Sequence, residues 1–377
     1  MAFTTIDDPE AYFQVHLYTG NGSANHAITL AGDTDMQPDM VWIKNRDAGD
    51  NHCWFDSIRG ATKHVGGWSG GSPYTGYAEV TDADTLDSFT STGFQVDADD
   101  KVNTDGEKYV ALCWKAGTAA SGTTTGSGTG KAYSSTYNDT SKLQITGYTG
   151  NGSAGHTIPV SLSTSPKTVW IKRRDAAGDI HMFHHRLTSA PETEYQTHNL
   201  AVAADDDGAW NDTAPSSSIV TLGDLATLNT DDATNIMWAW DEVQGFSKFG
   251  SFTGNGSADG PFCYCGFRPA LIINRKYDSS AGTTNFWTDE QNQSQNVMDT
   301  LQYVGWNDVE YGNPAAPQVT YQIDFLSNGF KFRGVRADTN VSGNGHIFWA
   351  FAKSPFVNSM EFLVLHFKGL SNNNFSV

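Results

Sequence analysis

Positively charged residues are scarce in this chain of 377 residues, which has 23 lysines and arginines against 42 aspartates and glutamates. The formal net charge is therefore −19. Contacts to phosphate groups require clustered lysine and arginine, so nucleic acids and anionic membranes are disfavoured as partners. The acidic balance favours solubility and low non-specific association instead.

Cysteine and long apolar runs are scarce as well. The four cysteines have no Cys-x-x-Cys spacing, which argues against a zinc ribbon or a redox pair. We expect all four to be reduced packing residues: Cys53, Cys113, Cys263 and Cys265. No apolar stretch is long enough to span a bilayer, so no membrane insertion is expected. The chain also starts without the basic and apolar segments of a secretory signal.

What the chain does contain is one short string in three copies. Thr-Gly-Asn-Gly occurs at residues 19–22, 149–152 and 253–256. Each copy is preceded by an aromatic residue and followed by Ser-Ala. Three copies of so turn-specific a string predict that one unit is built three times. A triplicated module more often supplies surface or valency than a single catalytic centre.

Two further landmarks recur in the same order. After each string comes a proline, with Val or Ile three positions on, a base six positions on and an acid nine positions on. The three sets are Pro38, Val41, Lys44 and Asp47; Pro166, Val169, Lys172 and Asp175; and Pro269, Ile272, Arg275 and Asp278. An asparagine followed eleven residues later by a large aromatic residue closes each unit, in the pairs Asn103 and Trp114, Asn229 and Trp240, and Asn340 and Phe351. We interpret the bases and acids as strand-end charges rather than as an active site.

These landmarks predict three tandem repeats, at residues 1–116, 131–243 and 244–356, each near the usual size of a β domain. The Gly/Ser/Thr-rich residues 117–130 are predicted to be a flexible linker without packed structure. Residues 357–377 have no counterpart in the repeats and are predicted to be a C-terminal tail. Its apolar part is either an assembly strand or an internal core strand.

The secondary structure is predicted to be all-β, because short apolar runs alternate with Gly, Asn, Asp and Pro clusters. The closing strand of each repeat has a large apolar face with period two: Val110, Leu112 and Trp114; Ile236, Trp238 and Trp240; Ile347, Trp349 and Phe351. The opposite face carries a small residue each time: Cys113, Ala239 and Ala350. A second layer packing closely on these small residues would explain them, so each repeat is predicted to be a two-sheet β-sandwich of jelly-roll or lectin-like kind. We expect Trp114, Trp240 and Phe351 to be buried within their own repeats.

Several long strings carry a resemblance to a known group of proteins. They are Tyr-Thr-Gly-Asn-Gly-Ser-Ala, Val-Trp-Ile-Lys-Asn-Arg, Gly-Ser-Gly-Thr-Gly-Lys-Ala-Tyr, Gly-Phe-Ser-Lys-Phe-Gly-Ser-Phe-Thr-Gly-Asn-Gly and Ile-Asp-Phe-Leu-Ser-Asn-Gly-Phe-Lys. Over nearly the whole chain, from Met1 to about Phe356, the sequence resembles repeat-containing virion proteins of marine tailed bacteriophages, cyanophages included. The resemblance implies a structural or tail-fibre-like component of the particle and brings no catalytic residues. The residues after Phe356 depart from the short polar ending associated with the group.

From the repeats and the resemblance we predict a non-enzymatic virion structural protein of tail-fibre or adhesin type. It would assemble in the host bacterial cytoplasm, use no cofactor, and bind other virion proteins and a host-surface glycan or outer-membrane protein. A homo-oligomer is expected, and a trimer is favoured because phage appendages commonly assemble around closed cyclic symmetry. A capsid decoration or head-spike protein is the alternative, and a polysaccharide depolymerase ranks third.

The candidate binding residues are three aromatic residues of one Gly-rich loop: Trp68, Tyr74 and Tyr77. A loop folded back over its own sandwich is the alternative interpretation. Three clustered histidines are expected to be ordinary strand or loop residues rather than metal ligands: His181, His184 and His185. The acids near Asp97 and Asp99 do not match a calcium-binding loop, so solvated turn acids are expected and no metal site is predicted.

Overall fold

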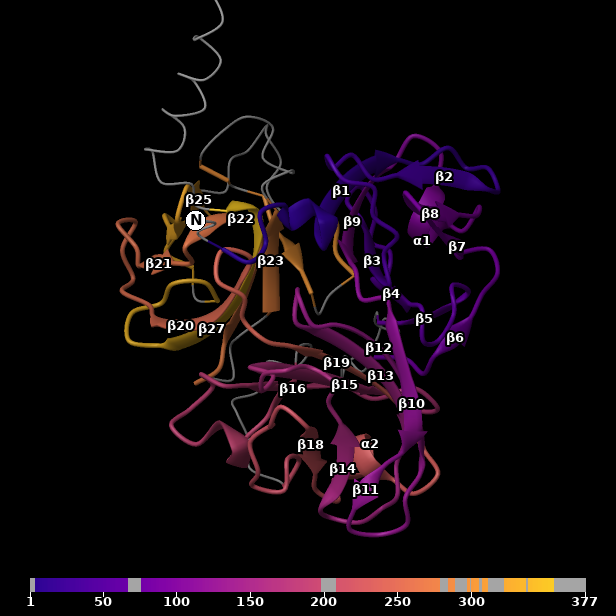
Figure 1. Ribbon diagram of the computed structural model, residues 1–377. Coiled ribbons are helices and arrows are strands. Elements are labelled where there is room, and N and C mark those ends of the chain that lie inside the picture. The colour runs from indigo at the N-terminus through magenta and orange to yellow at the C-terminus, as the bar shows by residue number, and fades with distance from the viewer. Residues whose placement is uncertain are drawn as a thin grey trace, which may run out of the picture.

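Three β-sandwich units surround a common centre in the computed structural model (Figure 1). We refer to residues 6–116 as unit 1, residues 118–243 as unit 2 and residues 245–355 as unit 3. The structure describes residues 4–66, 76–197, 208–278, 284–288, 297–298, 300–304, 307–310, 322–336 and 338–355. The predicted tail, residues 357–377, lies outside the described residues.

Each unit has a large antiparallel sheet. In unit 1 its strands lie in the order β1 (Phe13–Thr19), β9 (Lys108–Trp114), β3 (Met40–Asn45), β4 (Cys53–Asp56), β5 (Lys63–Val65) and β6 (Val80–Thr81). In unit 2 the order is β10 (Thr118–Thr123), β12 (Ala132–Asn138), β13 (Leu143–Thr149), β19 (Thr234–Trp240), β15 (Thr168–Arg173), β16 (Ile180–His184) and β17 (Gln196–Thr197). In unit 3 it is β20 (Ser247–Thr253), β27 (Gly345–Pro355), β22 (Phe267–Lys276), β23 (Thr284–Thr288) and β24 (Gln302–Tyr303). In all three sheets the closing strand (β9, β19 or β27) lies between the strand that leads into Thr-Gly-Asn-Gly and the strand at the proline landmark.

A small three-stranded sheet covers one face of each large sheet. The small sheets are β2 (His26–Thr29), β8 (Gly93–Val96) and β7 (Leu86–Thr90) in unit 1; β11 (Thr125–Gly126), β14 (His156–Pro159) and β18 (Ile219–Leu222) in unit 2; and β21 (Phe262–Tyr264), β26 (Gly329–Phe332) and β25 (Ile323–Leu326) in unit 3. The described helices are short: α1 (Asp100–Asn103), α2 (Ala226–Asn229), and the 3-10 turns η1 (Pro9–Ala11) and η2 (Pro191–Thr193). The predicted all-β sandwich class is confirmed.

The two faces of each closing strand are buried against different partners. The predicted small residues face the small sheet of their own unit, so the close-packed second layer is present: Cys113, Ala239 and Ala350. The large residues instead lie in a central core to which all three units contribute: Val110, Leu112, Trp114, Ile236, Trp238, Trp240, Ile347, Trp349 and Phe351. We call the face of a large sheet under its own small sheet the outer face, and the face toward the central core the inner face.

The three closing aromatic residues are buried, as predicted, but their own repeats do not cover them alone. Trp114, Trp240 and Phe351 are only 3–4% exposed, but their rings meet across units. The ring centroids of Trp114 and Trp240 are 6.3 Å apart, and those of Trp114 and Phe351 are 5.5 Å apart. Period two identifies an apolar face, but it does not say which surface covers that face.

Residues 117–130 are not the unstructured linker that their composition predicted. They contribute β10, which pairs with β12 at the edge of the large sheet of unit 2, and β11, which pairs with β14 in the small sheet. The side chains of β10 are almost all exposed, so this strand needs only backbone hydrogen bonds and little apolar content. Composition therefore misrepresented an edge strand as a solvated linker.

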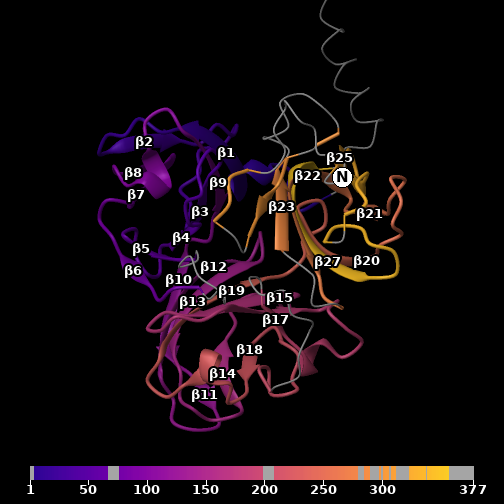
Figure 2. The same ribbon diagram turned by 180° about the vertical axis from the view of Figure 1, so that it is seen from behind.

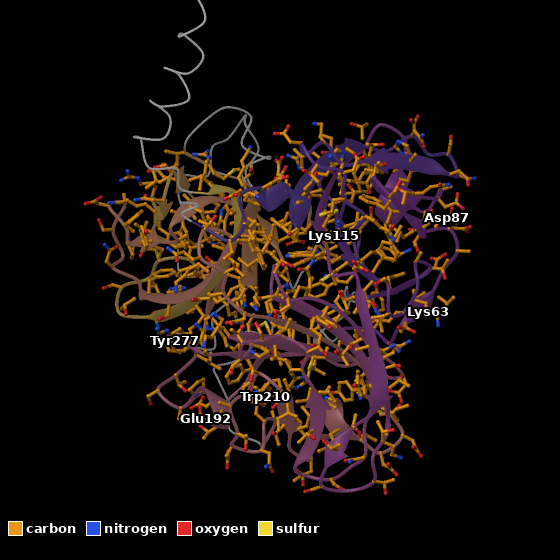
Figure 3. All side chains as sticks on the ribbon, in the orientation of Figure 1. Lys63, Asp87, Lys115, Glu192, Trp210 and Tyr277 are labelled. Carbon is orange, nitrogen blue, oxygen red and sulfur yellow. The ribbon has the colours of Figure 1, made fainter. Side chains whose placement is uncertain are left out.

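Seen from opposite sides, the units form a triangle, with unit 2 below units 1 and 3 (Figures 1 and 2). Side chains fill the space where the three units meet (Figure 3). Seven of the nine tryptophans that the structure describes lie in that central core: Trp42, Trp54, Trp114, Trp170, Trp238, Trp240 and Trp349.

Candidate functional site

The aromatic loop predicted to bind a partner is only partly within the described residues. Trp68 and Tyr74 lie outside them. Tyr77 is partly buried, and its hydroxyl lies 2.8 Å from Nδ1 of His64. Burial raises the pKa of the Tyr77 phenol. Tyr77 therefore packs onto its own unit, which favours the alternative interpretation at this position.

The Thr-Gly-Asn-Gly turns are held by the landmark asparagines through the same atoms in each unit. In unit 1 the Oδ1 of Asn103 accepts a hydrogen bond from the N–H of Asn21 (2.9 Å). Its backbone carbonyl accepts one from the N–H of Gly22 (2.8 Å). The same two contacts join Asn229 to Asn151 and Gly152, and Asn340 to Asn255 and Gly256. Two landmarks that lie far apart in the sequence thus form one structural element in each unit.

The two glycines of each turn are required for different reasons. A Cβ on Gly20 would lie 2.1 Å from the carbonyl oxygen of Thr104, and the first glycines of the other turns would meet a carbonyl oxygen at 2.3 and 2.2 Å. The second glycine, Gly22 in unit 1, has φ of 61°, in the left-handed region that disfavours side chains. Its counterparts have φ of 69° and 63°. The geometry of the fold accounts for the repeated string without a ligand.

The basic residues that follow the proline landmarks close loops from inside. Nζ of Lys44 donates hydrogen bonds to the carbonyl oxygens of Asn45 (2.5 Å) and Ala48 (3.1 Å), and Lys172 makes the matching two bonds in its own loop (2.7 and 3.2 Å). Burial lowers the pKa of both ammonium groups to about 8. These lysines stand at strand ends, as predicted, but they are buried and have a structural role.

The acids nine residues past the prolines fix the start of the closing strands in two units. Oδ2 of Asp47 accepts a hydrogen bond from the N–H of Lys108 (2.9 Å). Asp278 accepts one from the N–H of Gly345. In unit 2, Asp175 instead pairs with the Nε of Arg173 (2.7 Å).

Histidines hold unit 3 to the other two units. Nε2 of His185 lies 2.7 Å from the carbonyl oxygen of Phe249, and Nε2 of His184 lies 3.3 Å from that of Phe348. Burial lowers the pKa of both imidazoles, so the neutral form, with a proton on Nε2, suits these bonds. His184 and His185 therefore lie at an interface between units, whereas Nε2 of His181 lies 3.2 Å from the hydroxyl of Thr227 within unit 2.

His52 makes the corresponding contact between units 1 and 3. Its Nδ1 accepts a hydrogen bond from the indole Nε1–H of Trp42 (2.8 Å), which leaves its Nε2–H to donate to the carbonyl oxygen of Tyr303 (2.9 Å). A bidentate ion pair between Arg46 and Glu310 lies at the same interface, with a shortest N–O distance of 2.9 Å.

Charged residues join units 1 and 2. Arg174 donates two hydrogen bonds to the carboxylate of Glu79 (2.7 and 2.9 Å). Arg59 is paired with the buried Asp56 (2.6 Å) and lies 5.6 Å from the ring centroid of Trp238. No sequence pattern marked these interface residues, because each contact joins positions from different units.

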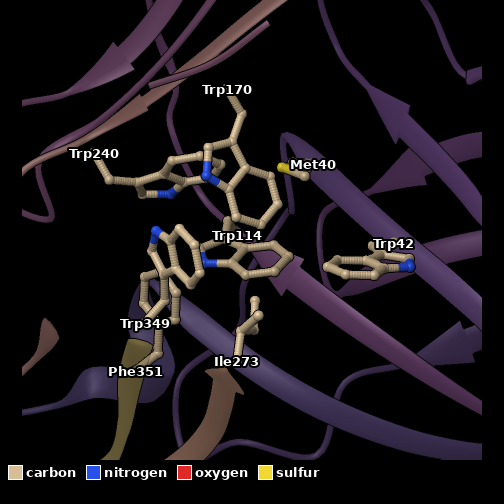
Figure 4. Close-up of a pocket in the computed structure, with 8 residues that line it drawn as sticks. All are labelled: Met40, Trp42, Trp114, Trp170, Trp240, Ile273, Trp349 and Phe351. Atoms are coloured by element: carbon tan, nitrogen blue, oxygen red, sulfur yellow. The ribbon is translucent and has the colours of Figure 1, made fainter. Parts of the chain in front are cut away.

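The aromatic rings at the centre enclose a small apolar cavity (Figure 4). Residues from all three units line it: Met40, Trp42, Trp114, Trp170, Trp240, Ile273, Trp349 and Phe351. The space is no larger than about one water molecule. The central core is therefore a packed interface and has no room for a ligand ring.

The cysteines and the acidic clusters take structural positions. All four cysteines are free and buried, and burial raises the pKa of each thiol. Asp99 caps α1 through a hydrogen bond from the N–H of Lys101 (2.8 Å), and Asn103 holds the first turn. Within the described part of the chain, no group of three or more His, Cys, Asp or Glu residues is arranged to hold a metal ion.

Sequence reasoning missed one exposed aromatic pair. Phe262 and Tyr264 of β21 are 46% and 60% exposed, whereas Cys263 between them is buried. The alternation Phe-Cys-Tyr, with a small inward residue between two aromatic ones, is the signal that could have identified the pair.

Among the described residues, no helix could span a membrane. No curated protein and no solved structure matches the chain. A family model described as "Domain of unknown function (DUF7483)" matches residues 8–355, so the chain belongs to this family.

Proposed function

We propose that this protein is a non-enzymatic structural component of a bacteriophage virion, of tail-fibre or adhesin type. It presents the outer surfaces of its three units to a host-surface molecule or a virion partner. The resemblance of its long repeated strings to virion proteins of marine tailed phages supports the virion assignment.

The observation that carries the display function is the arrangement of the units around one core. The inner faces of all three large sheets are buried against one another, and polar contacts join each pair of units. The small sheets and the Thr-Gly-Asn-Gly turns remain on the outside. A block of this kind presents several surfaces in fixed relative orientation, which suits binding to a partner through many weak contacts at once.

The residues that chemistry would use have structural roles here, which supports a non-enzymatic function. The landmark asparagines hold turns, Lys44 and Lys172 close loops, and His52, His184 and His185 bond to carbonyl oxygens of neighbouring units. We also propose a homo-oligomer, with a trimer favoured, since closed cyclic symmetry multiplies weak contacts.

Purified virions test this function. Mass spectrometry should find the chain in the particle, and electron microscopy with a labelled antibody should place it at the tail periphery. Label over the head would replace the proposal by a capsid decoration protein, and absence from purified particles would overturn it.

Two solution measurements test the remaining claims. Light scattering coupled to gel filtration should give a multiple of the chain mass, and a strict monomer would remove the oligomer. Turnover of a host polysaccharide by the purified chain, abolished by replacing one Asp or Glu pair, would replace the proposal by a depolymerase.

A further inference from the structure

The outer surface of unit 3 carries two aromatic side chains on one strand. Phe262 and Tyr264 are separated by one buried residue on β21, so both rings stand on the solvent side of the small sheet. β21 is an edge strand of this sheet and lies at the periphery of the molecule in both ribbon views (Figures 1 and 2). The pair is accessible to a molecule approaching from outside.

The strand register places a glycine beside Tyr264 on the neighbouring strand. Tyr264 lies opposite Gly329 of β26, and Gly329 lies opposite Leu326 of β25. A side chain at position 329 is excluded, since a Cβ there would lie 2.1 Å from the carbonyl oxygen of Cys263. Tyr264 and Leu326 therefore lie on either side of a position that has no side chain. Their strands are two strand spacings apart, about 9.5 Å.

Charged groups form the adjacent row. Phe262 lies opposite Lys331, and Lys331 lies opposite Asp324. Nζ of Lys331 pairs with the exposed Asp259 (2.6 Å), and Nε of Arg333 pairs with Asp324 (2.6 Å). Hydrogen-bond donors and acceptors thus stand beside the two aromatic rings.

Units 1 and 2 lack this combination at the corresponding positions. In unit 1 the corresponding residue is also a glycine, Gly93, but Thr29 and Thr90 lie opposite it in place of Tyr264 and Leu326. In unit 2 the corresponding residue is Ile219, which lies opposite Pro159, so this position carries a side chain. Of the three small sheets described, the one in unit 3 has both the glycine and the exposed aromatic rings beside it.

We propose that this face of unit 3 binds a neutral glycan of hexose or N-acetylhexosamine units. The C–H face of a pyranose ring packs on an aromatic face, and its hydroxyl groups can bond to the charged row. Two aromatic side chains bury at most about 500 Å² together, below the roughly 800 Å² per partner of a stable protein interface, which favours a small ligand. A net charge of −19 disfavours an anionic polysaccharide. This inference rests on the proposed function and names the chemical class of its host-surface partner.

The test is an array of neutral oligosaccharides of glucose, galactose, mannose and N-acetylhexosamines, probed with the full chain. The oligosaccharide with the strongest signal is then titrated calorimetrically. Y264A and the double variant F262A/Y264A should weaken binding at least about tenfold. T29A, at the corresponding strand position of unit 1, is the matched control and should bind like the wild type. Because the replaced rings are exposed, all variants should keep the wild-type melting temperature.

Absence of binding to every oligosaccharide on the array would overturn the inference, and so would equal binding by the wild type and the double variant. Virion localisation is measured without a glycan, so the two proposals fail separately. A chain found at the tail that binds no oligosaccharide loses the glycan site alone. A chain that binds through Tyr264 but is missing from the particle loses the virion function alone.

Discussion

The inner and outer faces of the large sheets are covered in different ways. On the outer face, small residues such as Ala239 lie under a small sheet of the same unit. On the inner face, tryptophans such as Trp240 lie against the other two units. The outer face is therefore covered by strands of the same unit, whereas the inner face is covered only when all three units are present. Adjacent residues of one strand thus belong to two different levels of organisation.

The largest expected effect comes from the inner face. Trp240→Ala should lower the free energy of unfolding by about 3–5 kcal/mol, the usual loss for a large core aromatic residue. The ring is 4% exposed and contacts Trp114 and Trp170 from two units. Equilibrium unfolding in urea measures the change, and Trp240→Phe should cost less. An unchanged unfolding midpoint for Trp240→Ala would show that the units do not depend on their shared core.

A change at the neighbouring residue tests the outer face. Ala239→Val adds volume to the closely packed core of unit 2 and should cost about 1–3 kcal/mol through overpacking. Ala350→Val makes the same change in unit 3 and should behave alike. The same urea experiment applies, and a gain in stability would mean that the small sheet leaves free space above this position.

The turns allow a comparison among all three units. Asn229→Ala removes the side-chain acceptor for the N–H of Asn151 and should cost about 1–3 kcal/mol for the buried group left unpaired. Asn103→Ala and Asn340→Ala should cost similar amounts, because they hold their turns through the same atoms. Unequal losses, or non-equivalent positions of the three asparagines after superposition of the units, would contradict the three-repeat prediction.

The last effect expected is a pH dependence from the buried His346, which is nearly absent at pH 7 and develops only in acid. Burial lowers the pKa of His346 to about 4, while the unfolded chain keeps a value near 6.5. Below pH 6.5 the unfolded state therefore binds the extra proton, and stability falls by up to about 1.4 kcal/mol per pH unit until pH 4. Unit 2 has Asn235 at the position of His346 in the strand pairing.

His346→Asn should therefore lower the slope of the unfolding free energy against pH between pH 6.5 and 4. The change should correspond to the uptake of up to one proton on unfolding. Urea titrations at several pH values measure the slope, and the wild type at pH 7 is the reference. An identical slope in the variant would show that His346 is not neutral in the folded protein.

The sequence was sufficient for the class and for the local elements of the fold. Alternation with period two identified the closing strands, and small residues such as Cys113 correctly indicated a second layer. The Thr-Gly-Asn-Gly strings marked turns, because glycine is required there by φ and by close backbone approach. Composition failed at residues 117–130, since an exposed edge strand has the same residues as a linker.

The candidate site shows the same limit. The sequence pointed to Tyr77 because it lies among Gly and Ser residues, but the folded chain turns its hydroxyl toward His64. The alternation Phe-Cys-Tyr could have indicated the pair Phe262 and Tyr264, but only the fold shows their exposure and the glycine opposite Tyr264.

By itself the sequence determined an acidic, all-β chain, its turns, and the alternation of large and small residues along the closing strands. Only the tertiary structure decided that the large faces meet one another, that buried histidines and ion pairs join the units, and that β21 presents two exposed rings. The physical reason is that local patterns follow from backbone geometry within a few residues. The partner of an apolar face, and the exposure of a ring, depend on contacts between residues that lie hundreds of positions apart, as between Arg46 and Glu310.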